Sequence, residues 1–229
     1  MSMLDRIGTA LVIAPHPDDE VLGCGGTIAR LASGGKAVDV AIVTRGMPPA
    51  FSQAQVDEVR AEAGAAHRML GVRDSHYLDF PAARLDQTPQ AELNKALHDL
   101  IAKVAPDTLF IPFVGDIHID HQLIFHGAMV ASRPAGGFRP SRILAYETLS
   151  ETNWSAPYLT PAFAPNVFVE IDGHLDTKVA AFECFASQCR SFPNERSVES
   201  LRALAALRGS CVNVRAAEGF VLVREIDAR

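Results

Sequence analysis

Short apolar runs alternate with stretches of helical periodicity along this 229-residue chain, and no other feature limits its fold as strongly. The apolar runs predict strands at residues 11–14, 38–43, 76–80, 108–111, 143–146, 167–171 and 220–224. The periodic stretches predict helices at residues 21–33, 56–70, 93–104, 120–131, 175–187 and 198–207. Repeated strand–helix alternation favours a parallel sheet with helices on both faces. We therefore predict an α/β fold with a mostly parallel sheet.

Composition narrows the function classes. Apolar residues make up 48% of the chain, which is enough for a substantial core. The net charge of 21 minus 27, or −6, argues against nucleic acid or an anionic membrane as the main partner. The 4 cysteines form no CxxC pair, and the first apolar run is too short for a signal peptide or a membrane span. We expect a cytoplasmic protein in a reducing compartment.

Two polar clusters follow predicted strands. The first is His16-Pro17-Asp18-Asp19-Glu20, directly after the first strand, and the second is Asp116-Ile117-His118-Ile119-Asp120-His121, after the fourth. In open parallel sheets ligands bind at the carboxyl ends of the strands, where both clusters fall. We expect the two clusters to meet in space despite their separation along the chain.

Each cluster has a simple structural interpretation. Acidic residues complement a helix N-terminus, and Asp120 can cap a helix. That interpretation does not explain His16 beside three consecutive acids, whose repulsion requires a compensating cation. Two histidines and one carboxylate form a catalytic zinc site with an open position for water, and a spare carboxylate can then act as general base. Residue types alone leave open which of Asp18 and Asp19 is the ligand.

The two motifs together resemble the LmbE-like/PIG-L family of zinc-dependent de-N-acetylases. The resemblance implies a single Rossmann-like three-layer domain over residues 1–229. It implies that His16, Asp19 and His121 are metal ligands and that Asp18 is the base. The second motif usually reads His-Pro-Asp-His, and here Ile119 replaces the proline. This replacement leaves the proposed ligands unchanged.

The resemblance also implies roles for residues around the metal. His118 would stabilise the oxyanion or protonate the leaving amine, and Asp120 would orient a histidine. Arg45 and Arg60 are candidates for contacting substrate oxygens. The loop 148–166, with the only tryptophan at position 154, is a candidate lid whose Trp154 either stacks on a sugar or packs on the core.

The implied activity is removal of an N-acetyl group from a small N-acetylated substrate, first of all an N-acetylglucosaminyl conjugate. A metal-bound water deprotonated by Asp18 would attack the amide. Zn²⁺ is the expected ion, with Fe²⁺ or another divalent ion left open. The number of subunits is also open, a homo-oligomer included.

Two other functions use the same residues. Two histidines and a carboxylate also form the site of non-haem Fe(II) oxygenases, in which Asp18 would have no task. The strand–helix alternation disfavours the all-β barrel on which the local His-x-Asp spacing usually lies. A non-catalytic, metal-stabilised sugar-binding module would bind acetamido sugars without turnover.

Overall fold

The computed structural model describes residues 2–134 and 139–227. Its strands are β1 (Thr9–Ala14), β2 (Ala37–Arg45), β3 (Asp74–Pro81), β4 (Thr108–Pro112), β5 (Arg142–Tyr146), β6 (Val167–Glu170) and β7 (Ala217–Glu225). Its α-helices are α1 (Asp19–Ser33), α2 (Gln53–Leu70), α3 (Gln90–Val104), α4 (Ile119–Ala131), α5 (Leu175–Glu183) and α6 (Val198–Ser210). Single 3₁₀ turns lie at Leu4–Arg6, Leu85–Gln87 and Asp172–His174.

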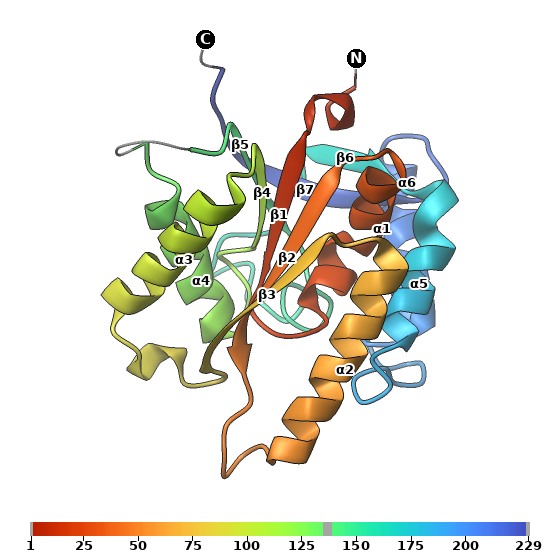
Figure 1. Ribbon diagram of the computed structural model, residues 1–229. Coiled ribbons are helices and arrows are strands. Elements are labelled where there is room, and N and C mark those ends of the chain that lie inside the picture. Colours follow the sequence, from red (N-terminus) through yellow and green to blue (C-terminus); the bar gives the residue numbers. More distant parts are fainter. Residues whose placement is uncertain (1, 135–138, 228–229) are drawn as a thin grey trace.

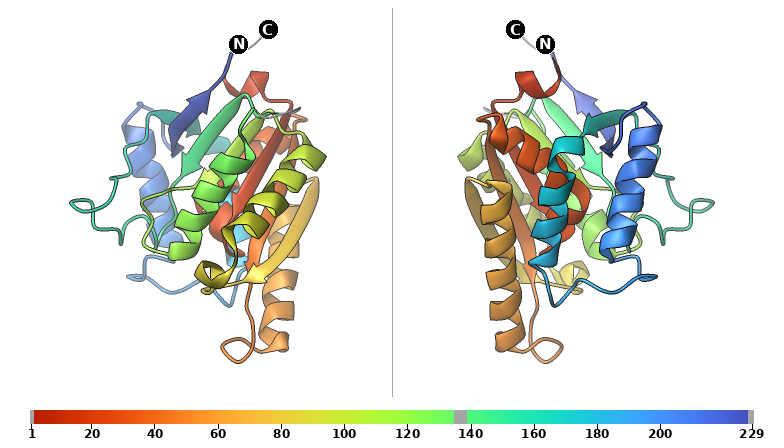
Figure 2. Two further views of the ribbon diagram at one scale, coloured as in Figure 1. Left: turned by 90° about the vertical axis from the view of Figure 1, so that its left-hand side faces the viewer. Right: turned by 90° about the vertical axis from the view of Figure 1, so that its right-hand side faces the viewer.

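The strands form one sheet in the order β3-β2-β1-β4-β5-β7-β6. The pairs from β3 through β5 are parallel, and β7 runs antiparallel to both of its neighbours. Helices α3 and α4 cover one face, while α1, α2, α5 and α6 cover the other (Figures 1 and 2). The predicted α/β fold with a mostly parallel sheet is therefore confirmed.

Strand order reverses between β1 and β4. The chain after β1 proceeds to β2 on one side, whereas β4 and β5 lie on the other side. The loops that follow β1 and β4 therefore diverge to opposite faces and leave a crevice at the carboxyl ends of these strands. The sheet topology thus brings together the two polar clusters noted in the sequence.

Two buried cores hold the three layers together. One core packs the α1, α2, α5 and α6 face, and the other packs the α3 and α4 face. Strands β1, β4 and β5 are buried on both faces, which explains their continuous apolar runs. Helix α5 ends at Glu183, earlier than the predicted 187, and irregular chain continues to α6. No helix among the described residues is both long and apolar enough to cross a membrane.

Glycines let α1 approach its neighbours closely. A Cβ on Gly23 would lie 2.3 Å from the ring of Tyr146, and one on Gly26 would lie 2.7 Å from Ile171. Neither distance leaves room for a side chain. This close packing fixes the position of α1, whose N-terminus carries the first polar cluster.

Candidate metal and active site

The loop between β1 and α1 carries the first cluster. Asp18 precedes the helix and has φ 109°, a region that residues other than glycine rarely adopt. Its backbone N–H donates to Glu20 Oε2 at 3.1 Å. Glu20 is buried and lies against the buried imidazole of His67, with Oε1 3.1 Å from Nε2. The buried Glu20 carboxylate thus stabilises the strained turn at Asp18 through this hydrogen bond.

The loop between β4 and α4 carries the second cluster. His118 caps α4, because its Nδ1 accepts a hydrogen bond of 3.1 Å from the backbone N–H of Asp120. The Asp120 carboxylate accepts from the backbone N–H of Ala83 at 2.7 Å and of Leu85 at 3.4 Å. Asp120 is therefore anchored to the segment that follows β3.

The two clusters meet as the sequence predicts. Nε2 of His16 lies 3.0 Å from Asp120 Oδ2. The ring centroids of His16 and His121 are 5.4 Å apart, and those of His16 and His118 are 4.6 Å apart. His16, His118 and His121 therefore face one crevice together with Asp19 and Asp120.

His16 and His121 each contact, through one ring nitrogen, a carboxylate that lies outside the proposed ligand set. His16 Nε2 bonds Asp120, which leaves Nδ1 3.4 Å from Asp19 Oδ2. His121 Nδ1 lies 2.9 Å from Asp116 Oδ2, which leaves Nε2 3.3 Å from the same Asp19 oxygen. Outer carboxylates fix the tautomer and orientation of metal-ligating histidines in this way.

The donor set fits a divalent metal ion. His16, Asp19 and His121 each offer one ligand atom, and these atoms all lie within 4.8 Å of one another. His121 Nε2 is buried and has no hydrogen-bond partner among the described residues, so this nitrogen is available to a ligand at the centre of the set. The ligand atoms of a second group, His16, His118 and Asp120, also lie within 4.8 Å of one another. There the Asp120 carboxylate is already occupied by two backbone N–H groups and His16.

Electrostatics match this arrangement. Burial lowers the pKa of His16, but its contacts with Asp120 and Asp19 outweigh this and raise it to about 9. Burial also lowers the pKa of His121, while Asp19 and Asp116 raise it to about 10. Burial acts to raise the pKa of Asp19, yet the two imidazoles hold it well below its usual range. The site thus favours a cation between these side chains.

Asp18 faces the pocket and contacts an arginine that sequence reasoning missed. Nη2 of Arg196 donates to Asp18 Oδ1 at 3.1 Å and lies 3.0 Å from Oδ2. Burial raises the pKa of Asp18, the guanidinium of Arg196 opposes this, and Asp19 and Glu20 raise it further. Arg196 comes from the irregular chain before α6, so it supplies positive charge to the acidic cluster from a distant part of the sequence.

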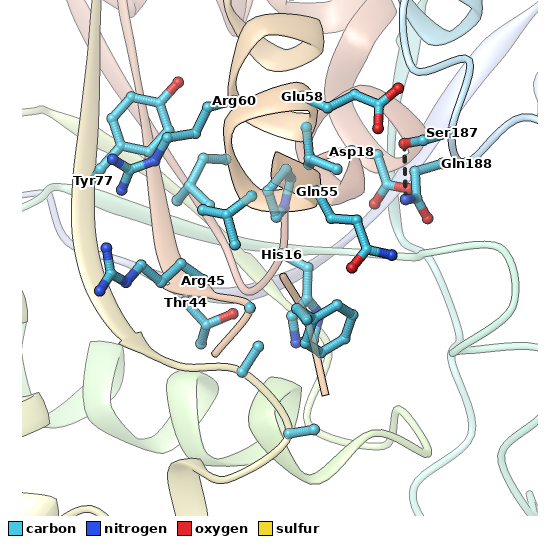
Figure 3. Close-up of a pocket in the computed structure, with 18 of the residues that line it drawn as sticks. His16, Asp18, Thr44, Arg45, Gln55, Glu58, Arg60, Tyr77, Ser187 and Gln188 are labelled. Carbon is cyan, nitrogen blue, oxygen red and sulfur yellow. Dashed lines mark hydrogen bonds between the residues drawn. The ribbon is translucent and has the colours of Figure 1, made fainter. Parts of the chain in front are cut away.

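A pocket of about 490 Å³ opens beside these residues. Figure 3 shows His16 near the middle of the pocket, Asp18 with Ser187 and Gln188 on one side, and Arg45 with Arg60 on the other. The structure therefore brings both predicted arginines to the pocket that contains the metal-site histidine.

The loop 148–166 contributes to the site only in part. Glu151 lines the pocket, and Thr152 Oγ1 donates to Asp116 Oδ1 at 2.6 Å. Trp154 is 63% exposed, so its side chain does not pack on the core, and it is not among the described residues that line the pocket. No local signal identified Thr152, since hydroxyl side chains are ordinary in loops.

Comparisons with known proteins agree with this geometry. Residues 11–132 match the family model of PIG-L, described as GlcNAc-PI de-N-acetylase. The uncharacterized deacetylase YaiS of Escherichia coli is 31% identical, over 76% of this chain and 88% of that protein. Diacetylchitobiose deacetylase of Thermococcus kodakarensis is 29% identical, over 93% and 82% of the two chains.

A solved structure extends the likeness to the whole fold. The conserved protein TT1542 from Thermus thermophilus superposes with a TM-score of 0.78 at 29% identity, covering 96% of each chain. The matched family region contains both polar clusters and the strands that place them. This chain therefore belongs to the PIG-L (LmbE-like) family of de-N-acetylases.

Proposed function

We propose that the protein is a metal-dependent hydrolase that removes the acetyl group from a small N-acetylated sugar of the N-acetylglucosamine type. One observation carries the proposal: Asp19 Oδ2 lies between His16 Nδ1 and His121 Nε2, while the neighbouring Asp18 lines the pocket. The names of the family and of the Thermococcus kodakarensis relative indicate acetamido sugars as the first substrates to examine.

His16, Asp19 and His121 would hold the metal ion, with Zn²⁺ the first candidate because imidazole and carboxylate suit it. When bound, such an ion acidifies water and polarises a carbonyl. Asp116 and Asp120 keep the two imidazoles in the tautomer that presents a lone pair to the ion. The outer carboxylates therefore act on orientation rather than on substrate.

Asp18 is the proposed general base. It accepts the proton of the attacking water, and Arg196 opposes the rise in the pKa of Asp18 that burial causes. The water oxygen then bonds to the amide carbon, and the carbonyl electrons move onto the oxygen. Protonated Asp18 returns the proton to the amide nitrogen, the electrons on the oxyanion re-form the carbonyl, and the C–N bond breaks. The products are an amine and acetic acid, which loses its proton to solvent as acetate.

His118 is the proposed oxyanion donor. Its Nδ1 accepts from the backbone of Asp120, so the neutral ring carries its proton on Nε2. Burial and the charge of His16 lower the pKa of His118, which keeps the ring neutral at pH 7. A neutral imidazole donates one hydrogen bond but has no spare proton to release. This tautomer assigns protonation of the amine to Asp18 and stabilisation of the oxyanion to His118.

The experiment is a panel of N-acetylated sugars incubated with metal-loaded protein and assayed for released acetate. We expect release from N-acetylglucosaminides and loss of release after chelation, with recovery when Zn²⁺ is restored. Turnover that consumes oxygen without releasing acetate would instead support the Fe(II) oxygenase. Binding without any turnover would support the sugar-binding module.

A further inference from the structure

Glu62 lies on α2, and both oxygens of its carboxylate accept hydrogen bonds from one residue of a distant segment. The backbone N–H of Ser187 donates to Oε1 at 2.9 Å, and the Ser187 hydroxyl donates to Oε2 at 2.6 Å. Each bond requires its own distance and direction, so the pair fixes both the position and the orientation of Ser187 relative to α2.

The hydrogen bonds continue from Ser187 to Arg196. Gln188 Nε2 donates to Ser187 Oγ at 3.1 Å, the contact drawn as a dashed line in Figure 3. Arg196 Nη1 donates to Gln188 Oε1 at 3.3 Å, and Nη2 of the same guanidinium donates to Asp18 Oδ1 at 3.1 Å. Because a guanidinium is planar and rigid, the bond at Nη1 restricts the direction in which Nη2 points. An unbroken series of hydrogen bonds therefore connects Glu62 with Asp18.

The backbone of the same segment adds a second constraint. Ser187 and Arg196 both belong to the irregular chain between α5 and α6. The backbone N–H of Arg190 donates to the carbonyl of Arg196 at 2.8 Å, which closes the loop 190–196 shortly after Ser187. Arg196 is thus the last residue of a loop that begins next to the residue bound by Glu62.

Glu62 itself lies outside the pocket. Ser187, Gln188 and Arg196 line the pocket, whereas Glu62 is not among the described residues that do so. A substitution at Glu62 therefore removes no atom that a substrate in this pocket would contact. An effect of Glu62 on the chemical step would act through the segment that it anchors.

We propose that Glu62 is a positioning residue for the general base Asp18. It holds Ser187 and Gln188, whose hydrogen bonds fix the orientation of Arg196. The Arg196 guanidinium in turn aligns the Asp18 carboxylate with the attacking water. The inference rests on the proposed deacetylase function, because it takes Asp18 as the base. Displacement of a catalytic group by about 1 Å can cost about a hundredfold in rate, so loss of this support should lower kcat.

The first test is steady-state kinetics of metal-loaded variants, with the N-acetylated sugar that shows the highest turnover, at the pH of maximal activity. Glu62→Ala should lower kcat about tenfold and change KM by less than about twofold. Glu62→Gln keeps one acceptor oxygen and should restore part of kcat. Asp57→Asn is the matched control, because it removes a carboxylate from an exposed position of α2 outside the pocket and should leave kcat unchanged.

The second test repeats Glu62→Ala in the Arg196→Gln protein. If Glu62 acts through Arg196, its substitution should lower kcat no further there, so the two single losses do not multiply in the double variant. A general defect in folding would give the same loss with or without Arg196. An undiminished loss in the Arg196→Gln protein, an unchanged kcat in Glu62→Ala, or a rise in KM in place of the fall in kcat would overturn the inference.

Chemical modification separates this inference from the proposed function. Phenylglyoxal reacts with guanidinium groups, and peptide mass spectrometry gives the modification rate of Arg196, which is 23% exposed, relative to that of the exposed Arg224. Glu62→Ala should raise this relative rate several-fold, because Arg196 is released from its partners, and Asp57→Asn should not. That result would support anchoring by Glu62 even if no acetate is released in any assay. An unchanged relative rate would overturn the inference and leave the deacetylase function standing.

Discussion

Arg196 Nη2 lies 3.0 Å from Asp18 Oδ2, although the two residues are 178 positions apart in the chain. The contact joins the irregular segment before α6 to the turn that precedes α1. It supplies a cation to a turn in which Asp18, Asp19 and Glu20 are all buried. The pairing opposes the rise in the pKa of Asp18 that burial causes, and so favours the carboxylate form of Asp18.

Removal of this cation should move the acidic limb of the pH–rate profile. Arg196→Gln takes away the group that lowers the pKa of Asp18, so burial and the neighbouring acids raise that pKa further. The base then becomes protonated at higher pH, and kcat/KM falls more on the acidic side of neutrality than on the alkaline side. Arg202→Gln, which breaks an exposed pair with Asp176, should leave the limb unmoved. An unshifted limb in Arg196→Gln would contradict the proposed role.

Substitutions of the two adjacent aspartates, Asp18 and Asp19, should have different effects on metal content and on activity. Asp18→Asn should retain the metal ion and lose roughly a hundredfold or more in kcat, the usual range for a general base. Asp19→Asn should lose the metal ion, since Asp19 Oδ2 faces both His16 and His121. Metal content by atomic spectroscopy and acetate release measure the two effects. Metal loss from Asp18→Asn with retention in Asp19→Asn would mean that the roles are reversed.

Asp116 should control metal affinity without touching the ion. Asp116→Ala removes the carboxylate that holds His121 Nδ1 at 2.9 Å, which frees the ring to rotate or change tautomer. We expect affinity to drop by roughly 10–100-fold, as for other carboxylates behind a metal-bound histidine. Competition with a chromogenic chelator measures the drop. Thr152→Val removes the hydrogen bond to Asp116 Oδ1 and the one accepted from the Thr148 backbone N–H but leaves the Asp116 carboxylate in place, and should have a smaller effect.

Metal binding should release protons at neutral pH. In the metal-free protein the pKa of His16 is about 9 and that of His121 about 10, so both rings carry two protons at neutrality. Each must lose one proton to become a ligand, and affinity should therefore rise as pH increases from neutrality toward about 10. Calorimetry in buffers of different ionisation enthalpy counts the protons. A binding enthalpy independent of buffer would contradict protonated imidazoles.

The same pKa values make a stability prediction for the metal-free protein. The pKa of His121 is higher in the folded than in the unfolded protein. The free energy by which protonated His121 stabilises the folded state is therefore fully present below about pH 6.5. That contribution is lost as pH rises through about 10. Denaturant midpoints of the chelated protein should decrease over this interval. In His121→Gln the decrease should be smaller.

Close packing of α1 can be tested away from the chemistry. Gly23→Ala places a methyl group 2.3 Å from the Tyr146 ring, so the helix or the ring has to move. Overpacking of this kind costs about 1–3 kcal/mol, which should appear as a lower melting temperature. Gly173→Ala is the control, because a Cβ there has no described neighbour within 4 Å. Equal melting temperatures for the two variants would show that the contact is easily relieved.

Local patterns determined the architecture and the location of the site. The apolar run at 11–14 and its counterparts predict buried parallel strands, and strand–helix alternation then places both polar clusters at one edge of the sheet. These signals are short-range, since periodicity and turn residues act within one element. The motifs that carry the family likeness are also contiguous, so the candidate ligands could be named before any contact was known.

Contacts between remote segments were decided only by the tertiary structure. Nothing in the sequence around Arg196 distinguishes it from an ordinary loop charge, and no carboxylates are arranged around His67 in the sequence. In the folded protein, Arg196 contacts Asp18 and His67 contacts Glu20 in the acidic turn. Which nitrogen of His16 and His121 faces Asp19 depends on Asp120 and Asp116 across a crevice. A hydrogen bond requires distance and direction in space, and neither is encoded in residue spacing once the partners belong to different elements.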